Sequence, residues 1–243
     1  YNKYWPSLLK TDCIIDHSWA KFSYTLKLEN RIKTPILGVC HAPIHTMFQS
    51  LPAIENPCFV CISQNQATIF QGLFNQPARV AYNGINLDFY RPMNSPRCQR
   101  YLFLARFSTI KGPHLAIEVC QKTNADLDMI GDTTITNDPA CLEQCRRLAD
   151  GKQIKMIGPA TRGECVWWFN QAYALLHPNK LFCEPFGLAP VEAQACECPV
   201  IAWNHGAMPE TVKHGETGFL VNNFAEMIEL IKTMTTMAIE SVT

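Results

Sequence analysis

One stretch of the sequence decides the fold, and it reads Phe182-Cys183-Glu184-Pro185-Phe186-Gly187-Leu188-Ala189-Pro190-Val191-Glu192-Ala193. Two carboxylates eight positions apart bracket a Pro-Phe-Gly-Leu turn and the opening of an apolar helix. The apolar run before it, residues 173–178, predicts a buried strand that ends at a proline. The order is therefore strand, loop, helix. Such a loop directs backbone N–H groups and the positive end of a helix dipole to one point, which suits a phosphate.

The two carboxylates are Glu184, on the predicted loop, and Glu192, inside the predicted helix. Both can face one bound molecule at different points along it. A carboxylate beside a phosphate is repelled, whereas a carboxylate beside a neutral hydroxyl accepts a hydrogen bond. An anion at the turn and a polyol at the carboxylates together describe a sugar nucleotide. For Glu192 alone a simpler role is also open, that of complementing the helix dipole.

Further motifs follow this stretch, and they are Cys198-Pro199-Val200-Ile201-Ala202, Gly206-x2-Pro209-Glu210 and Gly215-x-Thr217-Gly218-Phe219. Together with Glu-Pro-Phe-Gly-Leu-x3-Glu they resemble the Glu-x7-Glu group of retaining GT-B glycosyltransferases, glycosyltransferase family 4. The resemblance implies an α/β fold of GT-B type, with parallel sheets in two Rossmann-like domains. It also implies transfer of a hexose-type sugar from a nucleoside-diphosphate sugar to an acceptor hydroxyl.

Apolar runs near residues 12–19, 35–40, 59–63 and 78–82 alternate with helical stretches, which predicts a parallel sheet. This portion resembles the second half of the acceptor-side domain of GT-B enzymes. We therefore expect a partial N-terminal Rossmann-like domain over residues 1–92. A nearly complete nucleotide-sugar-binding Rossmann-like domain is expected over residues 93–243. Relative to the family, the chain is expected to be incomplete at both ends.

Two cations follow the strand predicted over residues 101–105, namely Arg106 and Lys111. A planar fork and a point charge beside a helix N-terminus make a sensible diphosphate clamp. The alternative is a pair of solvated cations on a surface loop. The Arg-x4-Lys-Gly pattern is again similar to the family.

Near the end of the chain, the last predicted strand covers residues 200–203, and a hairpin-like segment follows it up to Val221. From Phe224 onward, apolar residues recur at helical spacing and predict an amphipathic helix.

By the resemblance, Glu184 contacts the sugar hydroxyls and Glu192 the ribose. The N–H groups near sugar and phosphate belong to Phe186, Gly187 and Leu188. The loop after Gly158 borders the nucleobase.

Three histidines need separate readings. By the resemblance, His41 lies near the transferred sugar; the alternative is a histidine that bonds the adjacent turn. His17 is a weaker candidate for the same contact. His177 is interpreted as structural or peripheral to the site.

The composition excludes several classes of protein function. With 21 basic and 21 acidic residues in 243, no net field favours nucleic acid. No run approaches a membrane span or a signal peptide. We expect a cytoplasmic location, with peripheral attachment at the inner face of a membrane as an alternative. The twelve cysteines are expected to be reduced and buried, with a metal or redox role as the alternative.

The resulting hypothesis is a metal-independent, retaining glycosyltransferase with no cofactor and no metal site. Catalysis would rest on Glu184, His41, Arg106 and Lys111. A UDP-sugar is the first expected donor, with GDP- and ADP-sugars as alternatives, and the acceptor is a glycan, lipid or small molecule. A non-catalytic nucleotide-sugar-binding module, or an inactive fragment of such an enzyme, is the competing hypothesis. A nicotinamide-linked dehydrogenase is disfavoured, because no Gly-x-Gly-x-x-Gly opens a helix.

Overall fold

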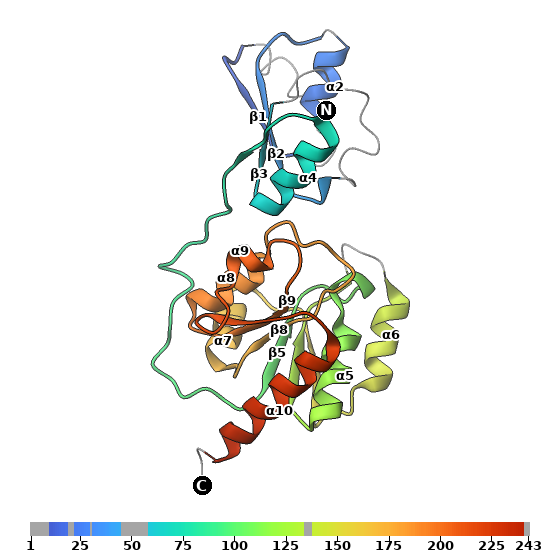
Figure 1. Ribbon diagram of the computed structural model, residues 1–243, viewed down its shortest axis with the longest axis vertical. Coiled ribbons are helices and arrows are strands. Elements are labelled where there is room, and N and C mark those ends of the chain that lie inside the picture. Colours follow the sequence, from blue (N-terminus) through green and yellow to red (C-terminus); the bar gives the residue numbers. More distant parts are fainter. Residues whose placement is uncertain (1–9, 19–21, 30, 45–57, 134–137, 241–243) are drawn as a thin grey trace. The chain divides into compact units, whose positions relative to one another are not determined.

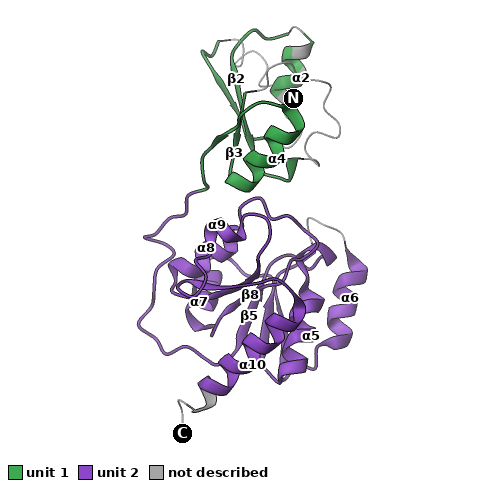
Figure 2. Ribbon diagram, in the orientation of Figure 1, with its two compact units in different colours: residues 1–83 green, residues 84–243 purple. Residues whose placement is uncertain are grey.

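The computed structural model of the chain describes residues 10–18, 22–29, 31–44, 58–133 and 138–240. The chain forms two compact units, residues 1–83 and 84–243 (Figure 2). Each unit has its own parallel sheet. Residues 84–92, which the sequence analysis assigns to the first domain, group with the second unit, and Tyr90 packs into the core of that unit.

The first unit is built on a four-stranded parallel sheet of order β1-β2-β3-β4 (Figure 1). Its strands and helices are β1 (Ile14–Asp16), α2 (Phe22–Leu28), β2 (Ile36–Cys40), β3 (Phe59–Cys61), α4 (Gln64–Phe74) and β4 (Arg79–Val80). Burial alternates along β2, as expected for a strand with one face on the core. Ser63 caps α4 by accepting a hydrogen bond from Gln66 N.

The second unit is built on a six-stranded parallel sheet of order β10-β9-β8-β5-β6-β7. Its strands are β5 (Tyr101–Leu104), β6 (Leu127–Ile130), β7 (Ile154–Gly158), β8 (Leu175–His177), β9 (Val200–Trp203) and β10 (Gly218–Val221). Its helices are η1 (Thr109–Lys111), α5 (Pro113–Thr123), α6 (Pro139–Leu148), α7 (Arg162–Gln171), α8 (Leu188–Ala195), α9 (Met208–Thr211) and α10 (Phe224–Glu240).

Helices cover both faces of this sheet (Figure 1). One face packs on α5, α6 and α10, and the other on α7, α8 and α9. Successive residues of β5 serve opposite faces, because Phe103 belongs to the first core and Leu102 to the second. The two Rossmann-like parallel sheets are the α/β architecture that the sequence predicts.

The strand order of the second unit reverses at β5. From β5 the chain moves outward through β6 and β7, and it then returns to place β8 on the other side of β5. In open α/β sheets, ligands bind outside the carboxyl ends of the strands at such a switch point. The segments after β5 and β8 contain Arg106, Lys111 and Glu184, so the topology brings these residues to one edge of the sheet.

The structure corrects one local expectation. Residues Gly218–Val221 do not form half of a hairpin, because β10 pairs with β9 in parallel through the register Gly218↔Val200.

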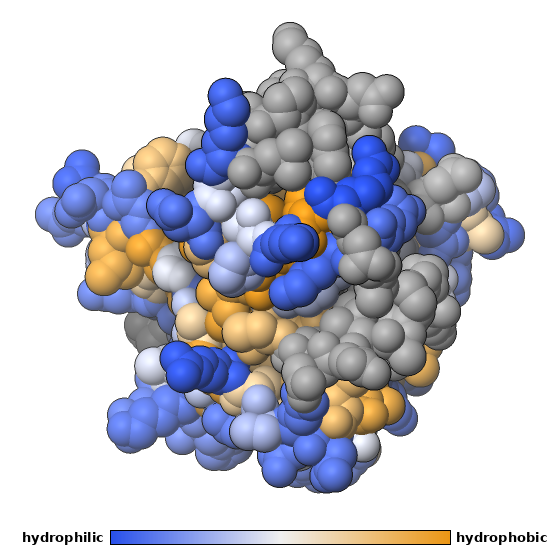
Figure 3. Space-filling view, turned by 90° about the horizontal axis from the view of Figure 1, so that it is seen from above, coloured by the Kyte–Doolittle hydropathy of each residue, from blue (hydrophilic) through white to orange (hydrophobic). Residues whose placement is uncertain are grey.

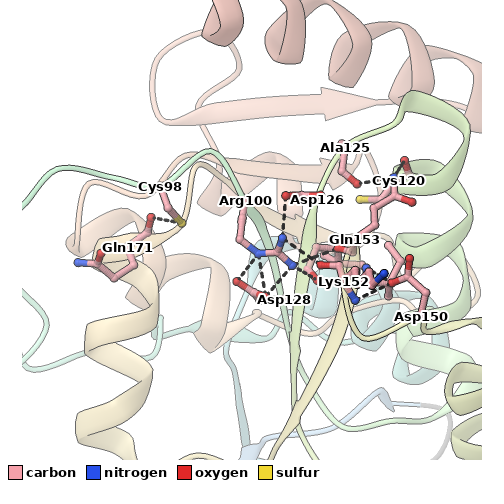
Figure 4. Close-up of polar contacts among 12 residues, drawn as sticks. Cys98, Arg100, Cys120, Ala125, Asp126, Asp128, Asp150, Lys152, Gln153 and Gln171 are labelled. Atoms are coloured by element: carbon pink, nitrogen blue, oxygen red, sulfur yellow. Dashed lines mark hydrogen bonds and ion pairs between the residues drawn. The ribbon is translucent and has the colours of Figure 1, made fainter. Parts of the chain in front are cut away.

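A buried ion pair ties the amino ends of β5, β6 and β7 together (Figure 4). Arg100 Nε lies 2.9 Å from Asp128 Oδ2, and Arg100 Nη1 lies 2.7 Å from Asp126 Oδ2. The same guanidinium donates to the carbonyls of Leu127 and Gln153, at 3.0 and 3.1 Å. This end of the sheet is therefore fixed by side chains, opposite the end where ligands bind.

Hydrophilic and hydrophobic residues are interspersed over the face shown in Figure 3. A search of the described residues found no helix of the length and apolar character needed to cross a membrane.

Candidate active site

A cavity of about 380 Å³ opens in the second unit, at the carboxyl ends of β5 and β8. Its charged lining residues are Arg106, Lys111, Arg162, Glu184 and Glu192. Its other lining residues are Tyr90, Leu104, Ala105, Cys165, His177, Gly187, Leu188, Ala189 and Pro190. Below we call this cavity the switch-point pocket.

The turn between β9 and α9 contacts the backbone of Glu184 and supports it. Ala207 N donates to Glu184 O at 2.9 Å. Gly206 has φ of +62°, and a Cβ on it would lie 2.8 Å from the backbone N and O of Glu184. A residue with a side chain would push this loop away, so glycine is needed there for close approach as well as for its backbone angle.

The side chain of Glu184 is buried and bonded through one oxygen. Lys111 Nζ lies 2.5 Å from Oε2, and Asn179 Nδ2 donates to the same atom at 2.9 Å. His177 Nε2 lies 3.5 Å from Oε2. Within the described part of the chain, Oε1 accepts no hydrogen bond. One oxygen thus serves the protein, while the other is left for a ligand in the pocket.

These neighbours also set the charge of Glu184. Burial alone would raise its pKa, but His177 and Lys111 outweigh burial and lower the pKa to about 2. The carboxylate is therefore ionised at any physiological pH and acts as a hydrogen-bond acceptor. It is not a group that donates a proton.

Lys111 ends the short helix η1, which is fixed on two sides. Gly112 has φ of +71°, and a Cβ on it would meet Pro178 O at 2.5 Å. On the other side, Asp138 accepts hydrogen bonds from Thr109 N and Thr109 Oγ1 at 2.8 and 2.9 Å. The ammonium also lies 4.5 Å from the centre of the Phe182 ring, within the range of a cation–π contact.

The sequence analysis assigns a diphosphate to the cations and neutral hydroxyls to the carboxylates. The structure adds a direct contact between the two sets, because Lys111 and Glu184 form an ion pair in the same pocket. Arg106 follows β5 and lines that pocket as well. Both predicted cations therefore share a cavity with both predicted carboxylates.

Glu192 lies in α8 and faces the same pocket. Burial raises the pKa of Glu192 above its ordinary value, and the nearby Tyr90 hydroxyl and Arg162 guanidinium oppose this rise. Burial and Glu192 together raise the pKa of Tyr90. The phenol therefore stays protonated and can act as a hydrogen-bond donor.

Gly187 and Leu188 line the pocket at the start of α8. The N–H groups of a first helical turn have no partner inside the helix and carry partial positive charge. Phe186 is placed differently, because its side chain is buried and it does not line the pocket. A contact from Phe186 to a ligand would have to come from its backbone.

Gly158 lies apart from these residues, at the end of β7, where it lines a second cavity of about 370 Å³. This cavity lies beside the carboxyl ends of β6 and β7, and its lining includes Asp132, Arg146 and Ile157. Gly158 O accepts a hydrogen bond from Gly131 N at 3.0 Å, which joins the two loops.

His41 belongs to the first unit, where it follows β2 directly. His17 follows the neighbouring strand β1, and His17 Nδ1 lies 2.7 Å from His41 Nε2 with the rings stacked. The structure thus brings the two candidate histidines of this unit together. The other candidates all lie in the second unit.

His177 and Asn179 are the neighbours of Glu184 that sequence reasoning missed. His177 was interpreted as structural or peripheral, yet it lines the pocket and is only 5% exposed. Asn179 is 2% exposed and bonds Glu184 directly. A polar residue at the carboxyl end of a central strand was the available signal.

The cysteines are only partly as expected. All twelve are reduced thiols, and those that are buried are Cys40, Cys61, Cys120, Cys141, Cys145, Cys196 and Cys198. Cys13 and Cys58 are exposed, contrary to the expectation of burial. Among the residues that the structure describes, no group of three His, Cys, Asp or Glu side chains is placed to hold a metal ion.

Comparison with known proteins agrees with this architecture. Residues 96–238 match the family described as "Glycosyl transferases group 1". Among curated relatives, D-inositol 3-phosphate glycosyltransferase from Paenarthrobacter aurescens is 29% identical over 248 residues, covering 87% of this chain and 60% of that protein. D-inositol 3-phosphate glycosyltransferase 1 from Catenulispora acidiphila is 26% identical over 197 residues, covering 70% and 46%. The chain spans about half the length of the curated relatives it matches.

Two solved structures share the fold. HepE from Anabaena in complex with UDP-glucose superposes with a TM-score of 0.77 at 20% identity, covering 96% of this chain and 71% of that one. Sucrose-phosphate synthase from Thermosynechococcus elongatus superposes with a TM-score of 0.77 at 20% identity, covering 97% and 70%. The chain thus shares the fold of these two structures, with two Rossmann-like parallel sheets.

Proposed function

The chain belongs to the group 1 glycosyl transferases, and from this premise we propose that it transfers a hexose from a nucleoside-diphosphate sugar to an acceptor hydroxyl with retention of configuration. The observation that carries the proposal is the switch-point pocket, which gathers Arg106, Lys111, Glu184 and Glu192. Fold alone would not support a particular chemistry, because one fold hosts many activities.

The diphosphate is assigned to the cationic side of the pocket. Arg106 and Lys111 supply charge there, and the first turn of α8 supplies amides at Gly187 and Leu188. Negative charge develops on the departing diphosphate during transfer, which is where preorganised donors lower the barrier most. Since cations and amides supply this stabilisation, the proposal calls on no divalent metal.

The sugar and the nucleoside are assigned to the carboxylates. Glu184 Oε1 is left to accept from sugar hydroxyls, because Oε2 is engaged by Lys111 and Asn179. Glu192 is assigned to the ribose, and the cavity at Gly158 to the base. A UDP-sugar is the first donor to test, since the Anabaena HepE structure contains UDP-glucose.

The acceptor side stays a prediction from the resemblance, including the contact of His41 with the transferred sugar. The relatives' name makes D-inositol 3-phosphate one candidate acceptor. Glycan, lipid and other small-molecule acceptors complete the panel. The predicted cytoplasmic location, with or without attachment to a membrane face, is checked by fractionating cells that express the tagged chain.

Transfer from radiolabelled UDP-glucose to this panel tests the proposal, with Glu184→Ala and Lys111→Ala as controls. Product that forms with the wild-type chain and disappears in both variants supports it. Binding of UDP without transfer to any acceptor would favour a nucleotide-sugar-binding module instead. Failure to bind UDP, GDP and ADP would contradict both.

A further inference from the structure

His177 has an arrangement that the proposed function does not yet use. It is the last residue of β8, its side chain is buried, and it lines the switch-point pocket. Its Nε2 is buried and makes no hydrogen bond within the described part of the chain. Buried polar atoms in native proteins almost always have a partner, so an unpaired one on a residue that lines the pocket calls for a role.

One carboxylate oxygen close to Nε2 already accepts two hydrogen bonds. Glu184 Oε2 lies 3.5 Å away and takes its bonds from Lys111 and Asn179. Because Glu184 is buried, removing Lys111 without a replacement would leave a poorly compensated negative charge.

Binding of a nucleotide-sugar donor would draw Lys111 away from Glu184 in this way. On the proposed function, a diphosphate arrives beside Arg106 and Lys111 and competes with Glu184 for the lysine. When the Lys111 ammonium binds the diphosphate, its hydrogen bond to Glu184 Oε2 weakens. The carboxylate then needs another donor within reach.

We propose that His177 is this replacement partner, a positioning residue that bonds Glu184 Oε2 when Lys111 turns to the diphosphate. The ring has to approach by less than ~1 Å to reach ordinary hydrogen-bond length. Either the neutral Nε2–H tautomer or the imidazolium supplies the proton. Glu184 then keeps its place, with Oε1 facing the sugar. This inference rests on the proposed function.

Two substitutions separate a donor at Nε2 from mere filling of space. His177→Gln places an amide N–H near the position of Nε2. His177→Asn has a shorter side chain that cannot reach Glu184 Oε2. UDP binding to the full chain is measured by calorimetry for the wild type and both variants, each with Glu184 and with Glu184→Gln. Melting temperatures are measured for every variant.

We expect His177→Asn to weaken UDP binding about tenfold, the lower end of what a hydrogen bond to a charged group contributes. His177→Gln should stay within about threefold of the wild type. With Glu184→Gln, the carboxylate charge is gone, so His177→Asn should change UDP binding less than about twofold. This loss of coupling would not follow from a purely structural role.

Equal weakening by His177→Asn with Glu184 and with Glu184→Gln would overturn the inference, as would wild-type affinity in His177→Asn. If His177→Asn fails to fold, His177→Met and His177→Gln provide the same comparison. A wild-type chain that binds UDP but shows no coupling contradicts the inference alone. A chain that binds none of UDP, GDP and ADP contradicts the proposed function as well.

Discussion

At the scale of single residues, the two oxygens of Glu184 have different surroundings. Oε2 is bonded by Lys111 and Asn179, while Oε1 accepts no hydrogen bond within the described chain, and the residue lines the pocket. A carboxylate fixed through one oxygen is oriented before a ligand arrives, which reduces the ordering cost of binding. The same ion pair, however, occupies a lysine that a diphosphate also needs.

Replacing Glu184 by glutamine should therefore have opposite effects on binding and on transfer. The neutral amide releases Lys111 and removes a negative charge beside the diphosphate, so UDP should bind as tightly as in the wild type or several-fold tighter. Sugar transfer should fall by about 100-fold or more, as when one preorganised polar group is lost. Calorimetry and the radiolabel assay measure the two effects, and a parallel loss in both would contradict this role.

The low pKa of Glu184 also predicts how stability depends on pH. Its pKa is about 2 in the folded chain and 4.5 as a reference value, so the folded state binds its proton less readily. The resulting stabilisation is fully present above pH 4.5 and is lost as the pH falls toward 2. The free energy of unfolding, measured in urea at pH 5 and pH 3, should drop less in Glu184→Gln than in the wild type. An equal drop would contradict the assignment.

Sequence reasoning found Glu184, Glu192, Arg106 and Lys111 because each lies in a local motif at a strand-to-helix turn. It did not find the partners, since Lys111 and Glu184 are 73 positions apart and their pairing depends on how two loops meet. His177 was set aside for a similar reason. Its neighbours are decided by the path of residues 178–187, which no spacing rule describes.

At the scale of elements, the site depends on loops that approach one another closely. The turn at Gly206 supports Glu184, and Gly112 seats η1 against Pro178. The motif Gly206-x2-Pro209-Glu210 was recognised from the resemblance, and the structure supplies a physical reason for its glycine. A residue that is distant in the sequence from Glu184 thus sets the position of Glu184.

Gly206→Ala should destabilise the chain by about 1 to 3 kcal/mol, because the added Cβ meets the Glu184 backbone at a positive φ. UDP-glucose binding should weaken as well. Gly163→Ala is the matched control, since Gly163 lies in α7 and a Cβ there meets nothing within 4 Å. Urea unfolding measures both variants. Equal stability of the two would contradict the close-approach argument.

The ion pair at the opposite end of the strands predicts a pure stability effect (Figure 4). The side chains of Arg100 and Asp128 are 17% and 9% exposed, so Arg100→Ala leaves a largely buried carboxylate unpaired. We expect a loss of about 3 kcal/mol or more in the free energy of unfolding. Lys213→Ala breaks an exposed ion pair with Glu216 and should change the free energy of unfolding by less than ~0.5 kcal/mol. Similar losses in both variants would contradict this reading.

Most strands and helices were predictable, because buried parallel strands read as short apolar runs and helices as longer periodic ones. The exception was β10, whose run Gly218–Val221 follows a turn and suggests a hairpin. Its parallel pairing with β9 uses the short connection through α9. Local spacing cannot distinguish the direction of pairing, because alternation is the same in both.

At the scale of the whole molecule, the chain is two Rossmann-like units, each with its own parallel sheet. All the residues of the switch-point pocket lie in the unit of residues 84–243, which also contains the family match. The fold was predictable from motif order along the chain. The division after Asn83 was not, because the polar, proline-bearing stretch typical of a linker lies later, at residues 91–96, while Tyr90 before it packs into a core of the second unit.

The central claim is that cations and carboxylates of one pocket bind a nucleoside diphosphate together. Calorimetric titration of the full chain with UDP tests it most directly, in the wild type and in the double variant Arg106→Ala, Lys111→Ala. We predict saturable binding at one site, weakened about 100-fold or more in the double variant, since two charged hydrogen-bond donors are lost. Absence of binding to UDP, GDP and ADP, or equal affinity in the double variant, would contradict the account.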